Sequence, residues 1–126
     1  MNHMKATGRH FVEDVHCVLE GADANELMRV ANLSVGGLFA ATKNPPALGE
    51  LVTIQLRLPR HDCWLTGRVS WINEPQKPIN PSLPEGFGLM FTGVPADDQS
   101  AIRDVLRRSE TMLGPGRPES ARGSDL

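Results

Sequence analysis

The sequence predicts an all-β fold, a six-stranded antiparallel barrel followed by one C-terminal α-helix. The 126 residues make about one domain. Twelve Gly and ten Pro exceed the usual share of these residues, which indicates many turns and therefore short strands. Six short segments with strand-like patterns follow one another before a single segment with helical spacing. Closing such a run of strands into a barrel removes its exposed edges.

The first three strands are expected in the N-terminal third of the chain. Residues 15–19 alternate between apolar and polar positions, which is typical of a half-buried strand. The small and polar residues 21–25 suit a hairpin loop, and residues 27–33 continue as a second strand. The segment 34–37 then interrupts the pattern, and the apolar residues 38–42 form the third strand.

The middle of the chain carries the clearest strand, at residues 52–58. Its apolar residues recur at every second position, with polar residues between them. The Pro- and Gly-containing segment 43–49 predicts a turn before this strand, and residues 59–62 predict a turn after it. Residues 63–72 alternate as the fifth strand, in which Gly67 indicates a bend.

The last strand and the helix follow a proline-rich segment. Four prolines in residues 74–84 prevent regular strand pairing and predict an exposed, stiff loop. Residues 86–94 form the sixth strand. Residues 95–109 change to helical spacing, and Asp97 and Asp98 lie early in that segment, where acidic groups favour the helix dipole.

The ends of the chain differ from this domain in composition. Residues 1–3 resemble a remnant of an expression vector. The expected divisions are a flexible arm at residues 1–8, the barrel with its helix at residues 9–109, and a disordered tail at residues 110–126. The tail is rich in Gly, Pro, Ser and charge, a composition that cannot offset the entropy lost on ordering.

Charge and cysteine content exclude several classes of protein. A net charge of −2 argues against nucleic-acid binding by electrostatics alone. No apolar run is long enough to predict a membrane span, and no signal peptide is evident. The two cysteines, Cys17 and Cys63, do not form a disulfide framework and are expected to be buried, inert thiols. These features predict a cytoplasmic protein.

No constellation of residues predicts catalysis, a metal site or a cofactor. The sequence has no nucleophile elbow, no phosphate-binding loop and no dinucleotide fingerprint. His61-Asp62-Cys63 groups possible metal ligands in an expected turn, but ordinary turn and strand residues explain it more simply. We therefore expect a protein that is not an enzyme.

The segment Asn32-Leu33-Ser34-Val35-Gly36-Gly37 is more specific. Asn32 and Ser34 lie two residues apart, so in extended chain their side chains share one face and offer hydrogen-bond donors and acceptors. Gly36 and Gly37 allow a bulky planar ligand to approach the backbone. The alternative is a β-bulge or loop in which Asn32 and Ser34 bond to nearby backbone groups.

This segment matches the pattern (Asp/Asn)-x-Ser-x-x-Gly, and the chain resembles the PilZ domain family from about Arg9 to Arg108. The likeness is greatest over residues 30–39, 44–49, 52–59, 67–71 and 86–91. The Gly-Gly-Leu-Phe form is similar to a subgroup common in myxobacteria and related deltaproteobacteria. The resemblance implies a six-stranded antiparallel barrel with a C-terminal helix. It also implies a bacterial receptor or adaptor for the second messenger cyclic di-GMP.

The same family carries an Arg-x-x-x-Arg motif just before the first strand. The best match here is Lys5-Ala6-Thr7-Gly8-Arg9, with lysine in the first place. Lysine keeps the positive charge but lacks the planar fork that pairs with a guanine edge or a phosphate. The ligand-binding residues implied by the resemblance are therefore Lys5, Arg9, Asn32, Ser34 and Gly37.

Two functions remain open from the sequence. In the first, the arm folds over cyclic di-GMP bound at the Asn32–Gly37 segment, and the ordered arm contacts a protein partner. In the second, the barrel no longer binds nucleotide and acts as a protein-interaction adaptor in motility, polarity or type IV pilus regulation. The proline-rich segment and the exposed face of the helix are the candidate contact surfaces for that partner.

Overall fold

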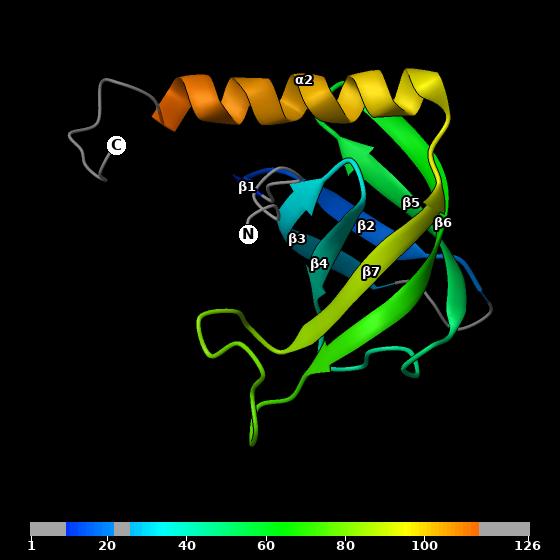
Figure 1. Cartoon of the computed structure of the whole chain (residues 1–126), viewed down its shortest axis with the longest axis vertical. Helices are drawn as coiled ribbons and strands as arrows, with labels where there is room; N and C mark the ends of the chain where they lie inside the picture. The colour runs from blue at the N-terminus through cyan, green and yellow to red at the C-terminus, as the bar shows by residue number, and fades with distance from the viewer. Residues whose placement is uncertain (1–9, 22–25, 114–126) are drawn as a thin grey trace, which may run out of the picture.

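The computed structural model describes residues 10–21 and 26–113 (Figure 1). The predictions for residues 1–9, including Lys5 and Arg9, for the loop residues 22–25 and for residues 114–126 lie outside the described residues. The elements are β1 (His10–Phe11), β2 (His16–Leu19), β3 (Leu27–Ser34), β4 (Gly37–Ala41), β5 (Leu51–Leu58), β6 (His61–Asn73), β7 (Gly86–Gly93) and α2 (Ala96–Leu113).

Six of the strands form a closed antiparallel barrel, as the sequence predicts. Hydrogen bonding runs through β2, β5, β6, β7, β4 and β3, and β3 pairs again with β2 to complete the circuit. The short β1 is an additional strand on β3 that the sequence did not predict. Every pairing is antiparallel, which agrees with short connections between consecutive strands.

A kink at Asp14 separates β1 from β2. Asp14 has φ of 61°, in the left-handed region that Asp tolerates better than most residues. Beside the kink the chain stays attached to β3, since Val12 N–H donates to Ala31 O at 3.4 Å and Val30 N–H donates to Val15 O at 2.9 Å. Residues 10–18 therefore run alongside β3, with one interruption at the kink.

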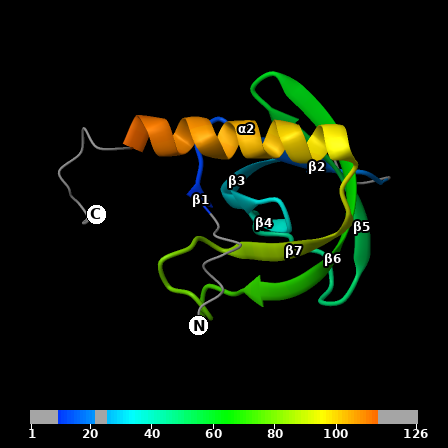
Figure 2. The ribbon, with the colours of Figure 1, turned by 45° about the horizontal axis from the view of Figure 1, so that its top comes forward.

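The alternating pattern of the strands fills the inside of the barrel. Ile54 and Leu56 on β5 and Leu65 on β6 are almost fully buried with the apolar residues of the other strands. Helix α2 lies across one end of the barrel and inserts Ile102 into this core (Figure 2). A second, smaller cluster of Ala31, Phe39, Leu83 and the half-buried Trp71 lies apart from this core. In the described ranges, no helix has both the length and the apolar character required to cross a membrane.

Two element boundaries and the burial of one loop residue differ from the sequence predictions. The turn after β5 contains only Pro59 and Arg60, because β6 already begins at His61. Helix α2 continues to Leu113, beyond the predicted end at Ser109. The proline-rich segment between β6 and β7 is mostly exposed, as expected, but Leu83 is buried against Ala31 and Phe39.

Stability is expected to fall as the pH rises above about 9. Burial, with a smaller contribution from Glu26, raises the pKa of Cys17 from its ordinary value of 9.0 to about 12. Between these values the folded chain keeps a thiol proton that the unfolded chain loses, so the folding equilibrium constant falls about tenfold per pH unit. Urea unfolding measured from pH 8 to 11 checks this, and Cys17→Ala should reduce the slope but not abolish it, because the pKa of the buried Cys63 is also raised to about 12. An unchanged slope in the variant would contradict the burial of this thiol.

Candidate functional site

The predicted segment Asn32–Gly37 forms the hairpin between β3 and β4 rather than a loop. Asn32 and Ser34 belong to β3, Gly37 opens β4, and only Val35 and Gly36 make the turn. Leu33 points into the barrel core, so Asn32 and Ser34 lie together on the outer face of the barrel, as predicted. A β-bulge between Val30 and Asn32 precedes them.

The Ser34 hydroxyl closes the turn of this hairpin. Ser34 Oγ accepts a hydrogen bond from Gly36 N–H at 3.1 Å and donates to Gly37 O at 3.4 Å. The side chains of Asn32 and Ser34 are buried, and the residues are 9% and 3% exposed. The bulge and the turn therefore agree with the local structural role that the sequence left open for these residues. A ligand would need Ser34 to exchange one of its two contacts.

Of those two contacts, the one that Ser34 donates is the weaker. A separation of 3.4 Å is long for a hydroxyl bonded to a carbonyl oxygen, whereas a hydroxyl oxygen can keep an accepted bond while its proton turns elsewhere. The proton of Ser34 can thus be redirected to a phosphate or guanine oxygen while the Gly36 bond, and the turn, remain intact. Gly37 adds no side chain beside it.

The N-terminal segment reaches the barrel next to this hairpin. In the antiparallel register of β1 and β3, His10 is opposite Leu33 and Phe11 is opposite Asn32. Toward its N-terminal end, β1 therefore runs in the direction of Ser34. The resemblance implies an arm that folds toward the motif, and β1, the first described element, pairs with the motif strand.

One row of paired residues crosses the outer face through Asn32. Phe11 pairs with Asn32, Asn32 with Phe39, Phe39 with Gly88, and Gly88 with Trp71. Paired residues of neighbouring strands present their side chains on one face. The Phe39 and Trp71 rings lie 5.2 Å apart between centroids at 37°, and the indole occupies the space over Gly88, where a Cβ would collide with it.

This row was not predicted from the sequence. Its members come from five strands, and no spacing along the chain signals that they are neighbours. Phe11 is 67% exposed at one end of the row, and Trp71 is partly exposed at the other. Planar rings on the same face as Asn32 and Ser34 provide surfaces on which a nucleobase could stack.

A separate groove of about 660 Å³ lies between β1, the β5–β6 turn, the proline-rich segment and α2. Its apolar lining includes Phe11, Ala31, Leu58, Leu83, Ala101 and Val105. The groove brings the end of the proline-rich segment beside α2, but Ala101 and Val105 pack against the core, so the groove uses the barrel-facing side of the helix and not the exposed face that the sequence predicted as a contact surface. Asn32, Ser34 and Gly37 do not line it, so this groove and the hairpin are two distinct candidate sites.

The charges of the groove are mixed. Arg29, Arg60 and Arg108 are matched by three carboxylates of Glu13, Asp14 and Asp104. Arg108 Nε lies 3.1 Å from Asp104 Oδ2, in an ion pair on the surface of α2. Such a balance does not favour a doubly charged anion, but it suits a polypeptide with both apolar and charged side chains.

The comparisons with known proteins agree with this architecture. The family model "PilZ domain" matches residues 7–108. No curated protein matches the chain. Among solved structures, the chain is similar to the PilZ domain with c-di-GMP of YcgR from Escherichia coli, with a TM-score of 0.61 and 18% identity, covering 84% of this chain and 94% of that one.

Two longer proteins are similar over part of their length. The inhibitor of motility MotI/DgrA of Bacillus subtilis has a TM-score of 0.61 and 21% identity, over 82% of this chain and 50% of that chain. MrkH of K. pneumonia, solved as a c-di-GMP complex, has a TM-score of 0.62 and 18% identity, over 89% and 54%. This chain thus spans about half of each. At these identities the likeness shows a shared fold, and together with the family match over most of its length it shows that the chain belongs to the PilZ domain family.

Proposed function

We propose that this chain is a receptor for cyclic di-GMP that binds the nucleotide at the β3–β4 hairpin and signals through protein contacts. The observation that carries the proposal is the pairing of β1 with β3, which places His10 and Phe11 beside the motif strand at Leu33 and Asn32. The solved structures of YcgR and MrkH with c-di-GMP support it from the same fold. The likeness to the myxobacterial subgroup stays a prediction.

Each proposed ligand residue has a chemical role. Lys5 and Arg9 supply positive charge to the phosphates, and the Arg9 guanidinium can also pair with a guanine edge. Asn32 and Ser34 hydrogen-bond the ligand from the outer face, where Gly37 leaves room for it. The ligand orders the arm, and the ordered arm becomes a new surface for a partner. Nothing in this proposal requires catalysis.

The test is an amide-shift titration of the ¹⁵N-labelled chain with cyclic di-GMP. We expect shifts at Ser34, Gly36 and Gly37, loss of binding in Arg9→Ala, and binding weakened about 2- to 10-fold in Ser34→Ala, the value of one neutral hydrogen bond. Arg103→Ala, on the exposed part of α2, removes the same charge far along the chain and should bind normally. Ser70→Ala, whose hydroxyl bonds to Gly88 O, is the control for Ser34.

Absence of shifts with excess nucleotide, while the YcgR PilZ domain binds under the same conditions, would contradict the receptor proposal. It would favour the second candidate, a protein-interaction adaptor that uses the groove between the proline-rich segment and α2. The specific observation for that candidate is the apolar groove that the proline-rich segment forms with the barrel-facing side of α2. The adaptor then captures its partner equally with and without nucleotide, and Arg60→Glu at the rim of the groove reduces capture.

A further inference from the structure

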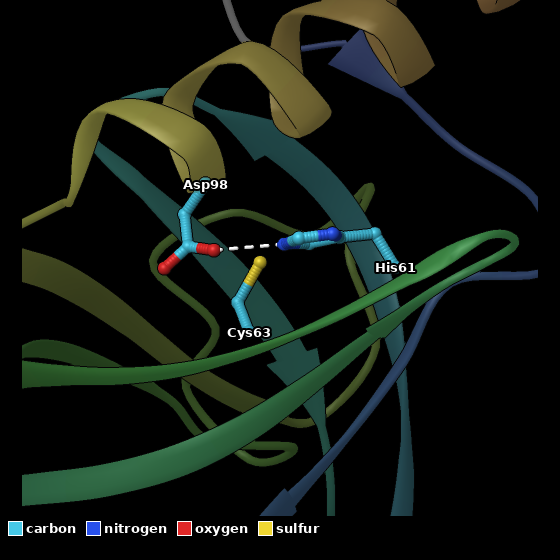
Figure 3. A group of neighbouring side chains, drawn as sticks. All are labelled: His61, Cys63 and Asp98. Atoms are coloured by element: carbon cyan, nitrogen blue, oxygen red, sulfur yellow. Dashed lines mark hydrogen bonds and ion pairs between the residues drawn. The ribbon is translucent and has the colours of Figure 1, made fainter.

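The structure brings His61, Cys63 and Asp98 together where the start of β6 meets the first turn of α2 (Figure 3). His61 Nε2 lies 2.8 Å from Asp98 Oδ1, although the two residues are 37 positions apart in the sequence. The Cys63 thiol lies beside both, and the three ligand atoms are all within 4.8 Å of one another. The sequence places His61 and Cys63 close together in an expected turn, whereas Asp98 joins them only because α2 docks on the barrel.

We propose that these three side chains bind a divalent cation of the zinc class, with water as the fourth ligand. An imidazole nitrogen, a thiolate and a carboxylate are the ligand types that Zn²⁺ takes in proteins. In a tetrahedral zinc site the ligand atoms lie about 3.3–3.6 Å apart, as follows from the usual bond lengths. The His61–Asp98 pair must open by about 0.5 Å, and the widest pair must close by no more than about 1.5 Å.

Side-chain rotation can provide these adjustments. The His61 side chain is 40% exposed and stands just after the two-residue turn that joins β5 and β6, whereas Asp98 is 15% exposed. His61 also lines the groove described above, so a cation can reach the cluster from that side. Cys63, by contrast, is 1% exposed and projects from the inner face of β6, which fixes the sulfur end of the site.

The charges of the proposed site balance. The Cys63 thiolate and the Asp98 carboxylate carry two negative charges, which equal the charge of Zn²⁺. Without a cation, burial first, and then the charge and hydrogen bond of Asp98, raise the pKa of Cys63 to about 12. Cation binding therefore replaces the thiol proton: the sulfur–metal bond forms and the proton leaves to solvent. His61 binds through the Nε2 lone pair of its neutral ring.

The proposed cation would join β6 directly to α2. The helix forms one wall of the groove, so a metal bond at its first turn would hold that wall against the barrel. Because the cation binds only the folded arrangement, it should also raise the unfolding temperature of the chain. This proposal does not depend on cyclic di-GMP, and its test contains no nucleotide.

The test uses Co²⁺ as a spectroscopic probe and Zn²⁺ as the stabilising ion, on the full chain. We expect a thiolate-to-cobalt charge-transfer band and the absorption of tetrahedral cobalt, both removed by competing Zn²⁺. Cys63→Ser should abolish the charge-transfer band. Cys17→Ser is the matched control, because Cys17 is an equally buried free cysteine on β2, and it should keep the band.

A second variant keeps the test decisive if Cys63→Ser does not fold. His61→Ala removes a partly exposed side chain and should fold, yet it should weaken Zn²⁺ binding by at least about tenfold. Absence of a charge-transfer band, or equal stabilisation of the parent chain and His61→Ala by Zn²⁺, would overturn the proposal. The cluster would then be a hydrogen-bonded contact between β6 and α2 only.

Discussion

Gly86→Ala is expected to destabilise the domain by more than about 3 kcal/mol, a large part of the stability of a chain of this size. Gly86 opens β7 and pairs with Ala41 on β4. A Cβ at this position would collide with the backbone oxygen of Ala40 and would lie 3.0 Å from Ala41 Cα. Backbone atoms in a barrel ladder cannot move aside as the end of a flexible side chain can, so the two strands must separate.

Gly93→Ala is the matched control for this variant. Gly93 ends the same strand, and a Cβ there would meet nothing within 4 Å. Its midpoint of urea unfolding should stay close to that of the parent chain, while that of Gly86→Ala falls sharply or no folded state remains. Equal midpoints for the two variants would contradict the close approach of β4 and β7.

The pairing of β4 with β7 also connects Gly86 to the candidate site. Gly37 pairs with Met90 on β7 and with Ser34 on β3, so β4 carries the motif between two partners. Separation of β4 from β7 would release the support of the hairpin. A Gly86→Ala chain that stays partly folded is therefore expected to lose nucleotide binding together with its stability, although Gly86 lies at the far end of the ladder from Gly37.

The sequence predicts those parts of the fold that local patterns determine. The strand at Leu51–Leu58 was predicted within one residue because one of its faces is buried and the other is not. The short β1 was missed, because two residues carry no period and their pairing with β3 depends on a partner more than twenty residues away. The turn at Pro59 was predicted too long, because the pattern of β6 begins at exposed residues, His61 and Asp62.

The candidate site is likewise predictable only where a local pattern determines it. Alternation around Leu33 predicts that Asn32 and Ser34 share one face, and the structure agrees. Their burial could not be predicted, because it depends on neighbours from β1 and β4. The approach of Asp98 to Cys63 likewise results from the docking of α2, which a spacing along the sequence does not encode.

Asn73→Ala is expected to release the proline-rich segment and to cost about 2–4 kcal/mol of stability. Asn73 ends β6 and is 1% exposed. Its Nδ2 donates toward the backbone oxygens of Asn80, Leu83 and Pro84 at 3.0–3.1 Å, and its Oδ1 accepts from Asn80 N–H at 2.9 Å. One side chain thus ties the middle and the C-terminal end of the loop to the end of β6.

Removal of this amide takes one hydrogen-bond partner from three backbone carbonyls and from one backbone N–H. Alanine cannot replace any of these hydrogen bonds. The loop then also withdraws Leu83 from its buried contact with Ala31 and Phe39. Amide hydrogen exchange is the measurement, because Leu83 N–H donates to Asn80 O at 3.1 Å within the loop and should exchange much faster in the variant. Urea unfolding gives the accompanying loss of stability.

Asn80→Ala separates this effect from a general sensitivity of the loop. The Asn80 side chain bonds only within the loop, to Ser82 N–H at 3.0 Å and to the Ser82 hydroxyl at 2.6 Å, whereas its backbone carries the bonds to Asn73. We therefore expect Asn80→Ala to keep the Leu83 amide largely protected from exchange. Equal exchange rates at Leu83 in the two variants would mean that Asn73 does not hold the loop. Because Ser82, Leu83 and Pro84 line the groove, Asn73→Ala should also weaken an adaptor partner while leaving nucleotide binding at the β3–β4 hairpin intact.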